Sequence, residues 1–225
     1  MICVGLDGYR KGWVAVRVDG ETRELCFYST IIELLAKKFD VAAIDMPIGL
    51  PRRGERACDL AARRMLKPHS SRVFTGARRG LWGHASHAAA NRALRSRGEP
   101  GISIQLWHLG NKICELDAAM TPRRQARIRE AHPELVFLRL NAGKPLPSKH
   151  TGEGIRLRMR LLRAQGFREI GRWLTRDRLG SGAKADDVLD ACAVALAARD
   201  FHLRNVLPRG RADKDARGLK MQIWY

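Results

Sequence analysis

The chain has 225 residues, 45% of them hydrophobic and 29% charged, and its 42 lysines and arginines against 23 acidic residues give a formal net charge of +19. This composition excludes a disordered or fibrous chain, and the length suffices for a buried core. No apolar run reaches the roughly 18–20 residues that cross a bilayer, and no secretory signal pattern is present. The five cysteines show no C-x-x-C spacing, which argues against a disulfide framework or a zinc site. We therefore expect a cytoplasmic protein without a membrane span.

The start of the chain has the hydrophobic pattern of strands and one helix. Apolar and polar residues alternate over about residues 2–28, which predicts three short antiparallel strands joined by tight turns. A helix capped by a hydroxyl residue is predicted over residues 29–38. The continuous apolar run Val41–Met46 is typical of a strand buried on both faces. The predicted order is βββαβ, with Asp7 near the end of the first strand and Asp45 at the end of the fourth.

The rest of the chain is predicted to be mainly helical. The loops 67–83 and 141–154 separate the helices, and a short strand is predicted at Ile128–Ala131. The predicted helices are Arg53–Leu66, His84–Arg97, Ile102–Met120, Glu134–Leu140, Ile155–Ala164 and Asp186–Arg199. No repeat or linker marks an internal boundary, so we predict a single domain over residues 1–225 with a basic helical insertion at about 51–127.

The excess positive charge is concentrated in the middle of the chain. Residues 51–140 hold 18 basic and 7 acidic residues and residues 141–180 hold 10 and 3, whereas residues 1–50 and 181–225 are almost neutral. This distribution favours a surface for a polyanion beside a site built from the terminal segments. Arginine outnumbers lysine 32 to 10, which suits phosphate recognition, although a bias in the coding DNA gives the same ratio.

Four aspartates are candidates for a metal centre. Catalysis of phosphoryl transfer by two metal ions requires acidic ligands that converge from different elements. Asp7 and Asp45 end two strands that a βββαβ topology places side by side, and Asp187 and Asp190 share one face of the last helix. Asp7 and Asp45 alone are compatible with turns and Asp187 with a helix cap, whereas Asp190 lies a full turn into the helix beside apolar residues, where a charge is costly unless something positive meets it. Four aspartates at these positions together favour metal binding.

Three stretches resemble the ribonuclease H-like fold, and within it the Holliday-junction resolvases: GLDGYRKGWVAV, AAIDMPIGLP and DDVLDACAVALAA. Together with HSSRVF, EAHPELVF and PSKHTGEGIRLR, nearly the whole chain resembles a family of unknown function, DUF429, whose members are identified as predicted ribonuclease H-like nucleases. The resemblance implies an α/β fold with a ribonuclease H-like mixed sheet, a βββαβ start and helices on both faces. It also implies that Asp7, Asp45, Asp187 and Asp190 hold two Mg²⁺ or Mn²⁺ ions. Asp45 departs from the pattern, because the resolvases usually have a glutamate there.

Two polar loops contain candidate phosphate-binding residues. Ser70, Ser71 and Arg72 combine hydroxyls with a guanidinium, which suits an anion; the alternative is an ordinary capped loop. Lys149 and Thr151 precede a predicted helix, where a phosphate can bind to the first backbone amides.

His132 and Glu134 lie at the predicted junction of a strand and a helix. They are candidates for a general base or a further metal ligand. For Glu134 the alternative is that its charge complements the helix N-terminus.

These features predict a metal-dependent nuclease that hydrolyses phosphodiester bonds in DNA or RNA. The alternative is a non-catalytic nucleic-acid-binding protein with the same fold, and a small-molecule phosphotransferase is less favoured because the chain is short for such a fold. The expected partner is nucleic acid of either type. No oligomeric state is predicted.

Overall fold

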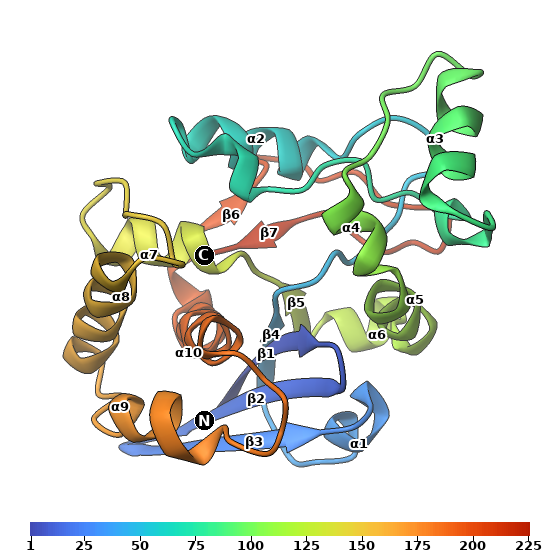
Figure 1. Ribbon diagram of the computed structural model, residues 1–225. Coiled ribbons are helices and arrows are strands. Elements are labelled where there is room, and N and C mark those ends of the chain that lie inside the picture. The colour runs from blue at the N-terminus through green and yellow to red at the C-terminus, as the bar shows by residue number, and fades with distance from the viewer. The chain divides into compact units, whose positions relative to one another are not determined.

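The computed structural model describes residues 1–225, and the chain divides into two compact units, each of which is described by itself (Figure 1). Unit 1 consists of Met1–Met46, Arg127–Asn205 and Trp224–Tyr225, and unit 2 of Pro47–Ala126 and Val206–Ile223. Unit 2 therefore includes most of the stretch 51–127 and a segment near the C-terminus. The single domain with an insertion stays a prediction.

A five-stranded mixed sheet forms the centre of unit 1, in the order β3-β2-β1-β4-β5. The strands are β1 (Ile2–Tyr9), β2 (Gly12–Asp19), β3 (Thr22–Tyr28), β4 (Val41–Ile44) and β5 (Ile128–Glu130). The first three are antiparallel neighbours, whereas β4 runs parallel to β1 and β5 parallel to β4. With α1 (Ile31–Leu35) between β3 and β4, the predicted α/β class and βββαβ order are confirmed.

Helix α1 is shorter than predicted. Its N-terminus is capped as expected, since the Thr30 hydroxyl accepts from the Glu33 amide at 3.3 Å and the Glu33 carboxylate accepts from the Ser29 amide at 3.1 Å. The helix ends at Leu35 instead of Lys38, because the Lys37 amide bonds to the carbonyl of Leu34 three residues back and tightens the chain into a turn.

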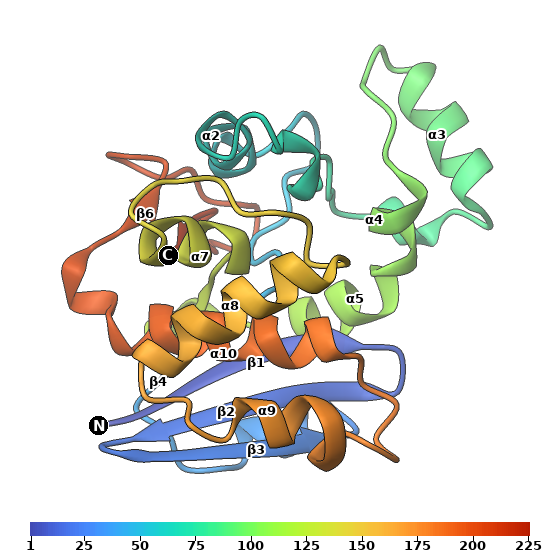
Figure 2. The ribbon, with the colours of Figure 1, turned by 60° about the vertical axis from the view of Figure 1, so that its left-hand side comes forward.

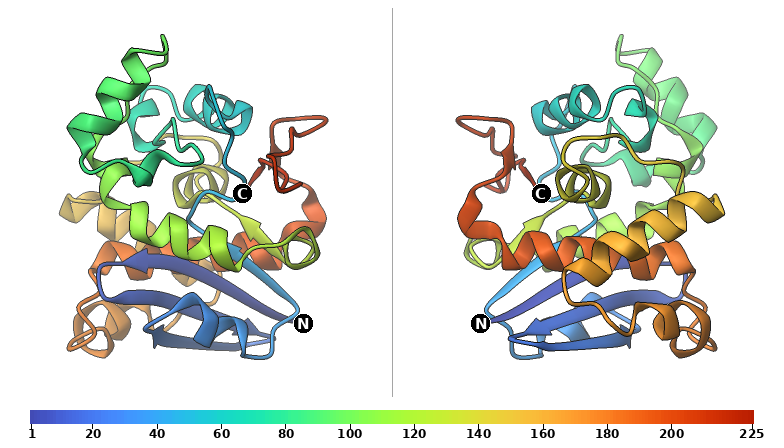
Figure 3. Two further views of the ribbon diagram at one scale, coloured as in Figure 1. Left: turned by 90° about the vertical axis from the view of Figure 1, so that its right-hand side faces the viewer. Right: turned by 90° about the vertical axis from the view of Figure 1, so that its left-hand side faces the viewer.

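The two faces of this sheet carry different helices. Helix α10 (Ala185–Arg199) packs on β1, β2 and β4, while α1 lies on the opposite face (Figure 3). Residues 188–198 of α10 are all buried, and all of them except Asp190 are apolar, as expected for a helix that is covered on every side. Against α10 also pack α7 (Pro133–Leu140) and α8 (Gly152–Ala164), as Figure 2 shows. Three short helical segments complete unit 1: α9 (Ile170–Arg172), a π-helical turn (Trp173–Asp177) and a 3₁₀ turn (Phe201–Leu203).

Unit 2 is mainly helical. Its helices are α2 (Ala57–Met65), α3 (His87–Arg95), α4 (Ile104–His108), α5 (Gly110–Ala119) and α6 (Pro122–Gln125), with 3₁₀ turns at Ser70–Arg72 and Leu81–Gly83. The short strand β6 (Val206–Leu207) pairs with β7 (Ile223–Trp224). No helix in either unit has the length and apolar character that spanning a membrane requires.

The prediction of one continuous helix over Ile102–Met120 is wrong, because α4 and α5 are separate. The indole nitrogen of Trp82 donates to the carbonyl of Trp107 at 3.0 Å. A Cβ at Gly110 would lie 2.1 Å from the Trp82 ring. The ring of Trp82 therefore occupies the break between the two helices, and glycine is the residue that leaves space for it.

A buried carboxylate joins the two segments of unit 2. Asp215 accepts from the backbone amides of Leu50 at 3.1 Å and Leu219 at 2.9 Å, and from the guanidinium of Arg79 at 2.7 Å. Arg79 also forms a bidentate ion pair with Asp117, at 2.8 and 3.0 Å. These contacts hold the Asp215 carboxylate in its charged form, so that its pKa is lowered although burial opposes this.

Candidate metal centre

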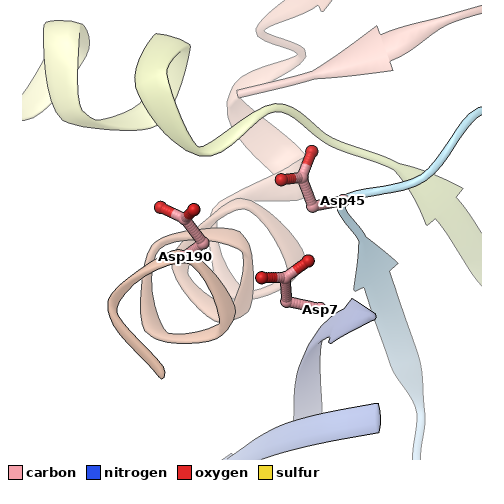
Figure 4. A group of neighbouring side chains, drawn as sticks. All are labelled: Asp7, Asp45 and Asp190. Atoms are coloured by element: carbon pink, nitrogen blue, oxygen red, sulfur yellow. The ribbon is translucent and has the colours of Figure 1, made fainter. Parts of the chain in front are cut away.

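Three carboxylates from separate elements of unit 1 form one cluster. Asp7 lies near the end of β1, Asp45 directly follows β4, and Asp190 lies within α10 (Figure 4). Each offers an oxygen atom, and these three atoms all lie within 4.8 Å of one another. The structure thus brings together three of the four aspartates that the sequence singled out.

Parallel pairing of two strands positions Asp7 and Asp45. Leu6 in β1 is the register partner of Ile44 in β4, and the Asp45 amide donates to the Leu6 carbonyl at 2.9 Å. The next residue along each strand is an aspartate, so the two side chains lie at the same edge of the sheet. The pairing of β1 with β4 therefore determines that these two carboxylates meet.

Close packing of α10 on β1 brings Asp190 to the other two. Gly5 lies two residues before Asp7 and thus on the same face of the strand. A Cβ at Gly5 would lie 2.1 Å from the carbonyl oxygen of Ala191 and 2.2 Å from the amide nitrogen of Ala195. The absence of a side chain at Gly5 therefore lets the backbones of strand and helix touch, beside the carboxylates.

The environment of the cluster opposes three negative charges. Asp7 is 8% exposed and Asp190 is 2% exposed, and Asp45 is half-buried. Burial first, and then repulsion by neighbouring carboxylates, raises the pKa of Asp7 and of Asp45 well above the ordinary value. Burial also raises the pKa of Asp190, although Lys149 opposes the shift. Such a site gains stability from a cation.

Lys149 supplies one positive charge inside this cluster. Its ammonium group donates to Asp190 Oδ2 and lies 3.6 Å from Asp186 Oδ2. Burial alone would lower the pKa of Lys149, but the charges of Asp190, Asp7 and Asp186 outweigh burial and raise the pKa. The sequence indicated a phosphate-binding role for Lys149 and missed its proximity to the carboxylates. The spacing of Asp186 and Asp190, four residues apart on one helix, is the signal that they share a cation.

The segment that carries Lys149 is fixed by a buried ion pair. Arg158 in α8 is fully buried and donates to Glu134 Oε1 at 2.6 and 3.2 Å. The same guanidinium donates to the Pro147 carbonyl at 2.9 Å. A Cβ at Gly154 would lie 1.9 Å from the Ser148 carbonyl oxygen, so the segment packs directly on the start of α8. We refer to Pro147–Thr151 as the Lys149 segment.

Asp187 is placed in the first turn of α10, where it caps the helix. Its Oδ2 accepts from the Lys184 amide at 2.6 Å, and burial raises its pKa to about 6. Its charge is close enough to raise the pKa of Asp7, but it lies outside the cluster of three. Its role as a metal ligand stays a prediction.

The other acidic candidates lie next to the cluster. Glu134 is near enough to raise the pKa of Asp45, but its carboxylate is paired with Arg158. Glu130, at the end of β5, also raises the pKa of Asp45 and is 5% exposed. Glu130 is not among the residues that the sequence motifs indicated; its place at the end of a strand parallel to β4 is the signal that would have found it.

The remaining candidates occupy turns and helix starts. His132 precedes α7 and its amide donates to the Trp224 carbonyl at 3.3 Å. Thr151 caps α8, since its hydroxyl oxygen accepts from the Gly154 amide at 3.1 Å and donates to the Ser148 carbonyl at 2.9 Å. Ser70–Arg72 form a 3₁₀ turn in unit 2 and are described separately from the carboxylates. For all of these, a role in binding or catalysis stays a prediction.

The chain belongs to the family described as protein of unknown function, DUF429, whose model matches residues 5–212. This match confirms the resemblance to DUF429 that the sequence motifs indicated. No curated protein and no solved structure compared with the chain matches it. The family description assigns no activity, so any function must be inferred from the site.

Proposed function

We propose that this DUF429 protein is a divalent-metal-dependent nuclease with a ribonuclease H-like fold. The observation that carries the proposal is the cluster of Asp7, Asp45 and Asp190, three carboxylates from two parallel strands and a helix, with oxygens within 4.8 Å of one another. The sheet order β3-β2-β1-β4-β5 and the helices on both faces support the ribonuclease H-like assignment.

The side chains of the cluster suit a hard divalent cation. All three are oxygen donors, the type of ligand that Mg²⁺ and Mn²⁺ take in proteins. Asp190 Oδ1 is buried and has no hydrogen-bond partner, a costly condition unless something positive meets it. A bound ion would supply charge stabilisation for a phosphoryl oxygen. The three carboxylates therefore fit the divalent cation that a metal-dependent nuclease requires.

Residues of unit 1 have separate roles in the proposed reaction. Asp7, Asp45 and Asp190 hold the cation, and Lys149 adds a positive charge beside it. His132, two residues after β5, is the candidate that accepts a proton from the attacking water. Glu134 orients Arg158 and through it the Lys149 segment, so we assign it to positioning.

Exposed arginines support a nucleic acid as substrate. Arg156, Arg160 and Arg163 are exposed and spaced four and three residues apart, so they line one face of α8. This helix begins directly after the Lys149 segment, which contacts the carboxylates. In unit 2, 20 basic residues stand against 7 acidic ones. A phosphate backbone is the ligand that such charge attracts.

A nuclease assay with Mg²⁺ or Mn²⁺ tests the proposal. Single-stranded DNA, duplex DNA, RNA–DNA hybrid and four-way junctions are incubated with the wild type, Asp7→Asn and the control Asp177→Asn, an exposed aspartate of unit 1. We expect cleavage of at least one substrate by the wild type and the control. For Asp7→Asn we expect a loss of about 100-fold or more, since removing one electrostatic contributor typically costs that much. Equal inactivity of wild type and Asp7→Asn on every substrate would contradict the proposal.

The ion pair between Lys149 and Asp190 favours a second candidate, a non-catalytic nucleic-acid-binding protein. In that case the ammonium group is the only cation that the cluster needs. Such a protein binds nucleic acid in the presence of EDTA as tightly as with Mn²⁺, and it cleaves nothing. Mn²⁺ that neither binds nor changes the thermal stability of the wild type would favour this candidate over the nuclease.

A further inference from the structure

The two oxygens of Asp190 have different environments. Oδ2 accepts from the Lys149 ammonium, whereas Oδ1 is buried without a hydrogen-bond partner. Asp190 also offers an oxygen within 4.8 Å of oxygens of Asp7 and Asp45, and Figure 4 shows the three side chains grouped where the helix meets the ends of the two strands. One oxygen of Asp190 is therefore already neutralised by a cation of the chain itself, and the other remains open to a ligand.

Neighbouring carboxylates and an ordered backbone hold Lys149 in this position. Its side chain lies between Asp190 and Asp186, which are four residues apart on α10. The backbone that carries it is fixed by the bond from Arg158 to Pro147 and by the packing of Gly154 against Ser148. A flexible surface lysine would lose more conformational entropy in forming this pair; here the segment is already ordered by contacts away from the site.

The charges of the cluster match one divalent ion. Asp7, Asp45 and Asp190 together carry three negative charges when ionised, which Lys149 and a single divalent cation balance. Asp186, outside the cluster of three, adds one more negative charge beside Lys149. A second divalent cation would have to share Asp186 and Asp190 with the ammonium group, which lies 3.6 Å from Asp186 Oδ2. A second cation bound to these carboxylates would lie close to the ammonium group, and like charges held close together repel strongly in a buried site.

We propose that the site binds one divalent cation and that Lys149 takes the place of a second. The inference rests on the proposed function, because it concerns the same carboxylates, and it departs from the two ions that the family resemblance implied. Lys149 remains on Asp190 when the ion binds to the cluster. The protein is then a nuclease that uses one metal ion and one lysine.

Counting bound Mn²⁺ tests the inference without measuring activity. Titration of Mn²⁺ into the metal-free protein, followed by the electron paramagnetic resonance signal of free Mn²⁺, gives the number of bound ions. We expect one ion in the wild type. In Lys149→Met, which keeps the length of the stem without the charge, we expect two, because Asp190 Oδ2 and Asp186 then become available. Lys149→Gln, a second variant should the first not fold, is expected to bind two as well.

Two control variants test whether the number of bound Mn²⁺ ions depends on the positive charge at position 149. Lys149→Arg keeps the positive charge and is expected to bind one ion. Lys144→Met removes an exposed lysine five residues away and is expected to bind one ion also. Two ions in the wild type, or one in both neutral variants with unchanged affinity, would overturn the inference and leave the metal centre intact. If the wild type binds no Mn²⁺, the proposed function itself fails, and the inference with it.

Discussion

At the scale of the residue, the informative feature is that Asp7 is buried and Asp45 half-buried, and that neither carboxylate accepts a hydrogen bond from a lysine or an arginine. Their pKa values are raised well above the ordinary value by burial and by the neighbouring carboxylates. Asp190 differs, because Lys149 donates to it. In the metal-free protein, ionisation of Asp7 or Asp45 therefore opposes folding, whereas ionisation of Asp190 also supports an ion pair.

The sign of the resulting pH dependence follows from linkage. A carboxyl group whose pKa is raised in the folded state binds its proton more tightly there than in the unfolded chain. The free energy of unfolding then falls as the pH rises from the unfolded pKa, near 3.8, through the folded one. Each pKa unit of difference corresponds to about 1.4 kcal/mol. Above the pKa that the carboxyl group has in the folded state, the full destabilisation of the folded protein by the ionised carboxylate is present.

We predict that Asp7→Asn stabilises the metal-free protein. In EDTA at pH 8 the melting temperature is expected to rise by roughly 2–4 °C for each kcal/mol gained, and the gain should shrink at pH 5. Calorimetry at the two pH values measures it, with the exposed Asp177→Asn as a control that shows no such gain. Addition of Mn²⁺ should stabilise the wild type and not Asp7→Asn. A lower melting temperature for Asp7→Asn in EDTA at pH 8 would mean that the raised pKa does not govern its stability.

At the scale of the element, the contact between β1 and α10 decides whether the site exists. Gly5 allows the strand backbone to approach Ala191 and Ala195, and Asp190 precedes Ala191 in the helix. The alanines of α10 serve the same purpose, because small side chains reduce the separation between helix and sheet. A side chain at position 5 would collide with backbone atoms of Ala191 and Ala195 in α10. Backbone atoms cannot rotate away from such a collision, as the end of a flexible side chain can.

We predict that Gly5→Ala weakens both the fold and the site. The added Cβ would lie 2.1 Å from the Ala191 carbonyl oxygen, and overpacking of this kind costs about 1–3 kcal/mol. Urea denaturation should show a lower midpoint, and Mn²⁺ affinity should fall because Asp190 moves away from Asp7. Gly83→Ala is the matched control, since a Cβ there meets nothing within 4 Å. An unchanged midpoint for Gly5→Ala would show that helix and strand are less tightly packed.

At the scale of the whole molecule, the positive charge is unequally divided and only partly available. Unit 1 holds 22 basic and 16 acidic residues and unit 2 holds 20 and 7. Several arginines are structural: Arg56 is buried against Asp59 at 2.5 Å, and Arg78 against Glu99 at 2.9 Å. The number of basic residues therefore overstates the number of positive side chains that a nucleic acid can meet, and exposed arginines such as those of α8 are the relevant ones.

We predict that the α8 arginines contribute measurably to the salt dependence of nucleic-acid binding. The logarithm of the binding constant should fall linearly with the logarithm of salt concentration, and each phosphate contact removed from duplex DNA should reduce the slope by about 0.9. Fluorescence anisotropy at several salt concentrations compares the wild type with Arg156→Ala/Arg160→Ala. The control Lys37→Ala/Lys38→Ala removes two exposed charges that follow α1, which lies on the other face of the sheet. Equal slopes for the α8 variant and the wild type would place the binding surface elsewhere.

Local patterns in the sequence were sufficient for the central part of the fold. The alternation of residues over 2–28, the hydroxyl cap at Thr30 and the apolar run Val41–Met46 act through neighbours in the chain, so they predicted the βββαβ order that the structure has. The same locality explains the error over Ile102–Met120, because the break in that helix depends on Trp82, which lies 25 residues before Trp107 in the sequence.

By itself, the sequence determined the family, the α/β class and the identity of the acidic residues on which the proposed chemistry depends. The tertiary structure alone decided which of them meet. It brought Asp7, Asp45 and Asp190 together, placed Asp187 as a helix cap, and seated Lys149 on Asp190. The physical reason is that these contacts depend on strand register and on the approach of two backbones at Gly5, neither of which local sequence periodicity records.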